Sequence, residues 1–230
     1  MTLPEPCASS PAPFGRRHVL LALLAAPLWR PAQAELTMQE RLPLVQRRAT
    51  WLRATLLRPT LDPRRIEADY TAALRQAEQM WEAGRGDDAI RALGVLQKYA
   101  PIAELPFIKA QLLLAAIAEH QHNTDLMRHH RAFATALVRA IDASGDGRSA
   151  TTALRLVLPS EADAWLIAHG ERYTALGKRP PGPGRHTHDV WRVRGTDGRE
   201  RDLYFDVSAM LRPVRPARRV SPAKPAAAAR

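Results

Sequence analysis

A short glycine-rich stretch carries the side chains of this 230-residue chain that are best suited to hold a ligand. It places an acid, a base and a hydroxyl among glycines, in the order Gly145, Asp146, Gly147, Arg148 and Ser149. Glycines let backbone N–H groups approach an anion closely, so the stretch is a candidate ligand loop. Its spacing is not that of a Walker motif. The alternative, which turn chemistry favours, is a tight turn in which Asp146 and Ser149 bond to local backbone.

Histidines are the second group of candidates, because imidazole is a common ligand of transition metals. The chain has no His-Glu-x-x-His motif, and the sequence therefore favours no metal and no other cofactor. His129 and His130 are adjacent and point about 100° apart on a helix. His130 lies on an apolar stripe and could join the Gly145–Ser149 stretch in a ligand site. The weak metal candidates are His120, His122, His186 and His188.

Most of these candidate residues lie on or next to predicted helices. Apolar residues recur at helical spacing through the first two thirds of the chain. Asp62 should cap the second helix, with Pro63 at its first position. Asn123 or Thr124 should cap the fifth helix, and Ser144-Gly145 should end it. The five predicted helices span residues 38–57, 63–83, 87–99, 105–120 and 124–143.

A small α/β module should follow at residues 145–210. We expect a strand at Leu154–Leu158 and a helix that Ser160 caps and Gly170 ends. A strand at Tyr173–Leu176 precedes a Gly/Pro-rich loop, and Asp197-Gly198 marks a β-hairpin. The hairpin strands span residues 190–194 and 202–207. The sequence thus predicts an α+β fold, with helical hairpins in residues 35–144 followed by this module and its C-terminal hairpin.

The turn after the second helix follows a pattern known from helical repeats. A similar turn, His122-Asn123-Thr124-Asp125, lies about 36 residues after Gly86-Asp87. Both turns resemble those of tetratricopeptide hairpins, whose period is about 34 residues. The resemblance implies a short helical layer of two hairpins instead of a long solenoid. The pattern of the first turn reads Trp81-x-x-Gly84-x-Gly86-Asp87-x-Ala89-Ile90, with Pro101 at the end.

A second resemblance rests on two segments of the module. They read Ser144-Gly145-Asp146-Gly147-Arg148-Ser149, with Thr152-Ala153 and Val157 after it, and Leu203-Tyr204-Phe205-Asp206-Val207. Both are similar to an exported bacterial family catalogued as domain of unknown function 4919. The resemblance covers roughly residues 64–208. It departs at Ala150-Thr151, where the family has Pro-Glu, and at Asp206, where it has Asn. It implies an architecture and a compartment, and it brings no activity to this chain.

The N-terminus is typical of an export signal. Arg16-Arg17 precede a short apolar run at Val19–Leu28, and Pro31–Ala34 supply small residues for cleavage after Ala34. The twin-arginine and general secretory routes both stay open. Removal of residues 1–34 would leave a periplasmic protein without cysteine and without a transmembrane segment.

Charge is concentrated at the two ends of the chain. Lys and Arg number 34 against 23 Asp and Glu, which gives +11, and eight of these units lie in residues 1–34 and 211–230. The +3 that remains for residues 35–210 argues against nucleic-acid binding. The Pro/Ala/Arg-rich tail at residues 211–230 has the composition of a disordered segment, and we interpret it as a possible contact for anionic envelope surfaces.

These patterns favour a periplasmic, non-enzymatic binding or scaffold protein of the cell envelope, with another envelope protein or a peptide as its partner. The alternative is a ligand-binding protein or hydrolase-like enzyme with its site at Gly145–Ser149. No catalytic residue is assigned, and whether the chain is an enzyme stays open.

Overall fold

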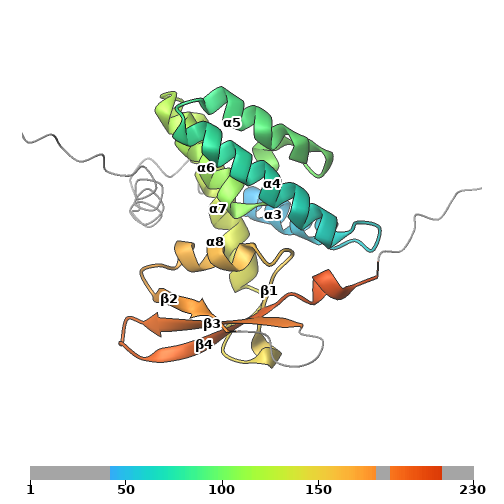
Figure 1. Ribbon diagram of the computed structural model, residues 1–230, viewed down its shortest axis with the longest axis vertical. Helices are drawn as coiled ribbons and strands as arrows, with labels where there is room; N and C mark the ends of the chain where they lie inside the picture. Colours follow the sequence, from blue (N-terminus) through green and yellow to red (C-terminus); the bar gives the residue numbers. More distant parts are fainter. Residues whose placement is uncertain (1–41, 180–186, 214–230) are drawn as a thin grey trace, which may run out of the picture.

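The computed structural model describes residues 42–179 and 187–213, and its first part is helical. Figure 1 shows these helices as a layer on one side of the molecule, with a small sheet on the other. Two short 3-10 helices, η1 (Gly94–Lys98) and η2 (Ile102–Glu104), lead from the first hairpin to the second. The α-helices of the layer are α3 (Leu42–Leu56), α4 (Pro63–Glu82), α5 (Gly86–Leu93), α6 (Ile108–His120) and α7 (Thr124–Asp142).

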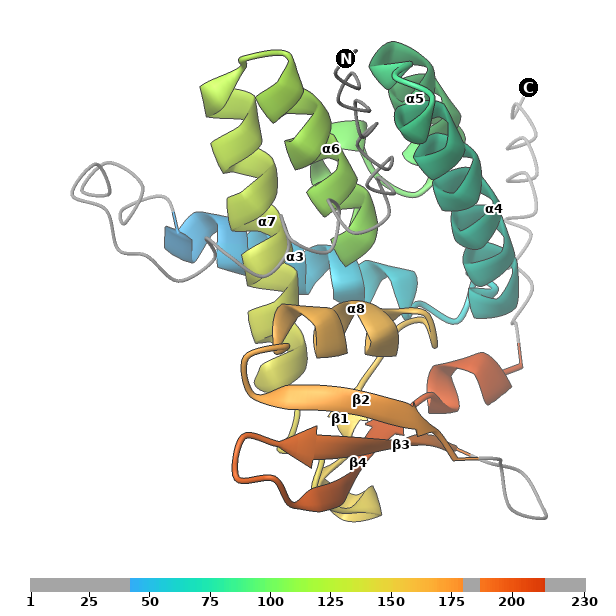
Figure 2. The same ribbon diagram turned by 60° about the vertical axis from the view of Figure 1, so that its left-hand side comes forward.

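The second part is the small module, and the chain is therefore α+β, as predicted. Its four strands lie in the order β1–β4–β3–β2, with β1 parallel to β4 and the other pairs antiparallel. Figure 2 shows α8 between the helical layer and the sheet. The elements are η3 (Ala150–Thr152), β1 (Leu154–Arg155), α8 (Glu161–Ala168), β2 (Tyr173–Lys178), β3 (His188–Gly195), β4 (Glu200–Asp206) and η4 (Ser208–Leu211).

The two helical hairpins, α4–α5 and α6–α7, turn in the same way. In the first, Gly84 has a φ of 76°, and the Arg85 N–H donates to the carbonyl of Met80 at 2.9 Å. In the second, His122 has a φ of 58°, and the Asn123 N–H donates to the carbonyl of Ala118 at 2.8 Å. Both turns are Schellman caps, in which the left-handed residue is usually glycine. His122 therefore occupies a glycine position.

Several predicted ends were right because side chains cap them locally. Asp62 accepts the Arg64 N–H at 3.0 Å with Pro63 at the start of α4, and Asn123 accepts the Leu126 N–H at 3.1 Å. The hairpin of β3 and β4 also forms as expected, with Gly198 at a φ of 72°. Of the other predicted segments, the export signal, residues 38–41, residues 180–186 of the Gly/Pro-rich loop predicted at 177–188, and residues 214–230 of the tail lie outside the described residues. The ends of that loop belong to β2, which reaches Lys178, and to β3, which begins at His188.

Other predicted ends were wrong, beginning in the helical layer. The third helix stops at Leu93 and continues as η1, because Gly94 and Val95 favour an α-helix poorly. Ala143 ends α7, and Gly145 is not in the left-handed region. Gly145 is needed for a close approach instead, because a Cβ there would lie 2.3 Å from the carbonyl oxygen of Thr152.

In the module, the strand expected at 154–158 is only two residues long. The carboxylate of Glu161 accepts the N–H of Val157 at 2.7 Å and of Leu158 at 3.3 Å, which removes both from strand pairing. The hydroxyl of Ser160 does not cap α8 as predicted. It donates to Glu67 of α4 at 3.0 Å instead, which ties the module to the helical layer.

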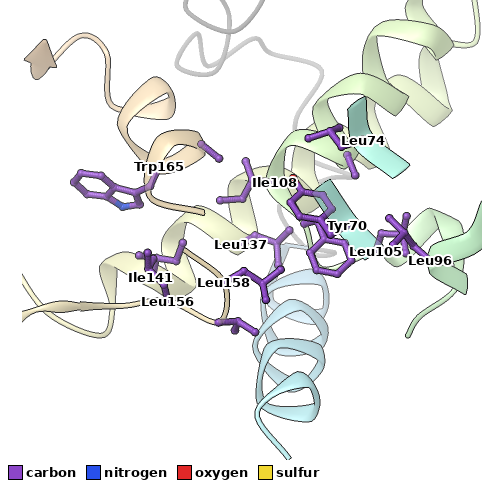
Figure 3. Packing of buried hydrophobic residues seen from close by; sticks show 14 of the residues in the cluster. Tyr70, Leu74, Leu96, Leu105, Ile108, Leu137, Ile141, Leu156, Leu158 and Trp165 are labelled. Carbon is purple, nitrogen blue, oxygen red and sulfur yellow. The ribbon is translucent and has the colours of Figure 1, made fainter. Parts of the chain in front are cut away.

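One hydrophobic core runs through both parts. Figure 3 shows some of its members, with Tyr70 and Leu137 from the helices and Leu158 and Trp165 from the module. A buried ion pair between Arg53 of α3 and Glu161 of α8 also joins the helical layer to the module. Removing either partner would leave an uncompensated buried charge, so the pair fixes how the two parts dock.

Candidate functional site

The glycine-rich stretch is a tight turn packed on the sheet. The carboxylate of Asp146 accepts the N–H of Arg148 at 3.0 Å, and Ser149 bonds to the hydroxyls of Thr151 and Thr152. The hydrogen bond from Thr152, followed by that from the Arg148 N–H, holds the pKa of Asp146 below its ordinary value. The polar groups of this stretch therefore bond to one another and to nearby backbone, as expected for a tight turn and not for a ligand loop.

The backbone of the same turn is also occupied. Gly147 has a φ of 69°, its N–H donates to the carbonyl of Thr152 at 2.8 Å, and its carbonyl accepts the N–H of Tyr204 at 2.8 Å. A Cβ at Gly147 would lie 3.1 Å from Leu154. The glycine therefore serves close packing of the turn on β1 and β4.

His130 does not join this stretch. It is buried in the first half of α7, where its Nδ1 donates to the side-chain carbonyl of Gln111 at 2.7 Å. Gln111 in turn donates to the carbonyl of Leu105 at 2.8 Å. Burial and the neighbouring His129 lower the pKa of His130 to about 4. The helix between His130 and Asp142 is roughly 18 Å long at 1.5 Å per residue, which separates His130 from the turn.

The other histidines lie at separate places. His120 meets the edge of Trp81, with ring centroids 5.5 Å apart. His122 lies in the hairpin turn, His188 is bonded to the hydroxyl of Thr187 at 2.8 Å, and His186 is outside the described residues. No group of three potential metal ligands is found within residues 42–179 and 187–213.

A second candidate site, found in the structure, was not predicted from the sequence. It is a pocket of about 100 Å³ between α6, α7 and the end of α8. Its walls are mostly apolar, and its rim carries an arginine, a carboxylate, a histidine and a threonine. The lining residues are Ile108, Leu112, Ala134, Thr135, Val138, Arg139, Asp142, Ala168 and His169.

A fixed group of three side chains forms the polar end of this pocket. Oδ1 of Asp142 accepts the indole N–H of Trp165 at 2.7 Å and lies 3.4 Å from Nε2 of His169. The rings of Trp165 and His169 are stacked, with centroids 4.0 Å apart. Partial burial raises the pKa of Asp142, but bonds from His169 and Trp165 and the charge of Arg172 outweigh burial, and the pKa lies below its ordinary value.

The second ring nitrogen of His169 decides what this group can do. Nδ1 lies 3.0 Å from the carbonyl of Trp165, one turn back on its own helix, while Nε2 faces Asp142. In a catalytic carboxylate–histidine pair, one nitrogen faces the carboxylate and the other is free to take a proton from the nucleophile. Both nitrogens of His169 face acceptors. The geometry therefore suits a rigid binding rim better than a general base.

Arg139, in the last turn of α7, adds a positive charge to the rim of the pocket. Its side chain is exposed at the rim of the pocket, one turn before Asp142 on α7. Among the residues that the structure describes, no ion pair involves Arg139. An anionic group on a ligand would find its complement here.

No protein-family model, curated protein or solved structure matches the chain. The similarity to domain of unknown function 4919 and to tetratricopeptide hairpins therefore stays a prediction. In the described part of the chain, no helix has the length and apolar character needed to cross a bilayer.

Proposed function

We propose that this chain is an exported, non-enzymatic binding protein that holds an aliphatic group of a peptide in the pocket between α6, α7 and α8. The periplasmic location rests on the N-terminal pattern of Arg16-Arg17, apolar run and small residues. The partner is a peptide segment, free or part of another envelope protein. The observation that carries the proposal is the mostly apolar pocket with a fixed polar rim.

The size of the pocket limits what enters it. A dry, apolar cavity of about 150 Å³ takes up benzene, so this pocket of about 100 Å³ suits a smaller group, such as a branched aliphatic side chain. Most of the lining is apolar, including Ile108, Leu112 and Val138. Burial of an aliphatic side chain there would contribute about 1.5–3 kcal/mol, which gives weak binding unless the rim adds to it.

The rim selects the neighbours of that side chain. Arg139 is exposed and has no ion pair in the described residues, while the carboxylate of Asp142 is occupied by Trp165 and His169. A peptide carboxylate next to the aliphatic side chain would pair with Arg139. The preferred segment is therefore aliphatic and acidic.

An NMR titration of the purified protein tests this proposal. The probe is acetyl-Glu-Leu-Glu-amide, and acetyl-Glu-Ser-Glu-amide and acetyl-Lys-Leu-Lys-amide are the comparison peptides. We expect the first probe to shift backbone signals in residues 134–142 and 168–169, and the other two to shift them at least about threefold less at equal concentration. Equal shifts with all three peptides, or none with the first, would refute the proposal.

A matched pair of variants locates the binding. Ala168→Leu adds three carbons at the wall of the pocket, at a half-exposed position that does not require repacking of the core. Ala72→Leu makes the same change on the exposed face of α4. Only Ala168→Leu should abolish the shifts. Retained binding in Ala168→Leu would place the peptide elsewhere.

The alternative site at Gly145–Ser149 receives less support. Asp146 and Ser149 bond to groups of their own turn, and His130 lies in the first half of α7 on Gln111. A hydrolase-like enzyme there would need a free nucleophile and a nearby base. In this turn the hydroxyl of Ser149 is bonded to Thr151 and Thr152, and His130 is not within reach as a base.

A further inference from the structure

Four exposed arginines gather where the α3–α4 loop meets the C-terminal end of the described chain. Figures 1 and 2 both show η4 beside this loop. Arg58 and Arg212 line one small depression, and Nε of Arg64 donates to the carbonyl of Met210 at 3.1 Å. We call Arg58, Arg64, Arg65 and Arg212, together with Leu211, the basic surface.

The charges of the basic surface are largely uncompensated. None of the ion pairs between described residues involves its four arginines. Two acids lie nearby: Asp62 accepts the backbone N–H of Arg64, and Asp69 interacts with Arg65 but is already paired with Lys98. The formal charge of the surface with Asp62 is therefore +3. The sequence beyond Pro213 adds five more Arg and Lys and no acid.

An apolar side chain projects among these charges. Leu211 is 39% exposed, although Ala209 of the same short helix η4 is buried. The depression beside it, between Pro59 and Pro213, has a volume of only about 10 Å³. This is too small to receive a side chain of a protein partner. A partner that fits must instead be flat, anionic and able to take up an apolar group at its surface.

We propose that the basic surface docks on an anionic lipid bilayer, with the arginines at the phosphates and Leu211 at the boundary of the acyl chains. Basic residues near an anionic leaflet each contribute about 1 kcal/mol, and an exposed apolar side chain adds to this by burial. A soluble polyanion would use the arginines and have no use for Leu211. The surface is separate from the pocket of α6, α7 and α8.

Co-sedimentation of the purified full chain with vesicles tests the proposal. The vesicles contain phosphatidylcholine with about 30% phosphatidylglycerol, and pure phosphatidylcholine vesicles are the comparison. The main variant is Arg58→Glu/Arg65→Glu/Arg212→Glu, which keeps the contact of Arg64 with Met210. We expect it to weaken binding to anionic vesicles at least about a hundredfold, because each arginine lost costs about fivefold and each glutamate added is repelled by the anionic surface.

A control variant carries the same change in charge elsewhere. Arg47→Glu/Arg75→Glu/Arg199→Glu alters three exposed arginines on α3, α4 and the β3–β4 turn. It should lose much less binding than the main variant, because screening limits distant charges to about 10 Å at 0.1 M salt. Equal losses in the two variants would overturn the proposal.

Two further measurements separate the other sources of binding. Deletion of residues 214–230 should weaken binding but leave the difference between the main and control variants. If the deletion alone abolishes binding, the basic surface is not the docking site. Leu211→Ser should weaken vesicle binding and leave polyphosphate binding unchanged. Equal effects of Leu211→Ser on both would also overturn the proposal, since the partner would then be a soluble polyanion.

Discussion

Acidification should destabilise this fold through one buried histidine. His130 is 3% exposed and donates to Gln111, and its pKa is lowered to about 4. In the unfolded chain the same ring titrates near an ordinary value of about 6.5. Between these values the unfolded chain binds a proton that the folded chain does not. Stability is therefore fully present above about pH 6.5 and falls as the pH falls towards 4.

The size of the effect follows from the two pKa values. A full shift from 6.5 to about 4 corresponds to about 3 kcal/mol at low pH, because one pKa unit is worth about 1.4 kcal/mol. Between about pH 7.5 and pH 5, about 2 kcal/mol of this is lost. This is a large part of the free energy of unfolding of a typical domain, which is about 5–15 kcal/mol.

Urea unfolding at both pH values measures the loss, with tryptophan fluorescence as the signal. His130→Asn removes the titrating ring, but its amide can still donate to the carbonyl oxygen of Gln111. We expect it to lower stability by about 1–2 kcal/mol at neutral pH through lost packing, and to reduce the pH-dependent loss by about 2 kcal/mol. His120→Asn, at an exposed position, should keep the pH dependence of the natural chain. Parallel pH profiles for the natural chain and His130→Asn would refute this reasoning.

Two further predictions concern the docking of the parts and the second hairpin turn. Glu161→Gln should destabilise the protein by about 3–5 kcal/mol, because Arg53 would be left buried without its partner, and Arg53→Met/Glu161→Gln should recover part of this in urea unfolding. His122→Gly should raise the free energy of unfolding by up to about 1 kcal/mol, since the left-handed conformation costs glycine nothing. Loss of stability in His122→Gly would show that its side chain stabilises the turn.

Helix starts and the β-hairpin were predictable because their determinants lie within a few residues. Asp62 and Asn123 cap through their own side chains, and Gly198 supplies the positive φ of the hairpin turn. Ends that depend on distant groups were not predictable. Glu161 accepts the N–H of Val157 with one carboxylate oxygen, while Arg53, from a helix about a hundred residues earlier, binds the other oxygen. No local pattern contains that information.

The candidate site residues show the same difference between features set by local sequence and features set by distant groups. Types and spacing singled out Gly145–Ser149, and the structure uses those residues for a turn. The pocket was not predicted because Asp142 and His169 lie near the ends of two different predicted helices. Only the packing of these helices brings the two side chains together. One signal was present in the sequence: Trp165 and His169 are four residues apart and share a helix face. Without the partner helix, that pair is also typical of ordinary core packing.

The docking of α8 links stability to the proposed binding. Trp165 packs on Phe205 of the sheet, with ring centroids 5.6 Å apart, and also donates to Asp142 of α7. The same residue therefore anchors α8 to the sheet and fixes the acid at the rim of the pocket. Because His169 is stacked on Trp165 and held by its carbonyl, the rim is set before any ligand arrives. A preorganised rim lowers the entropy cost of binding, and this favours recognition by a pocket too small to supply much affinity by burial alone.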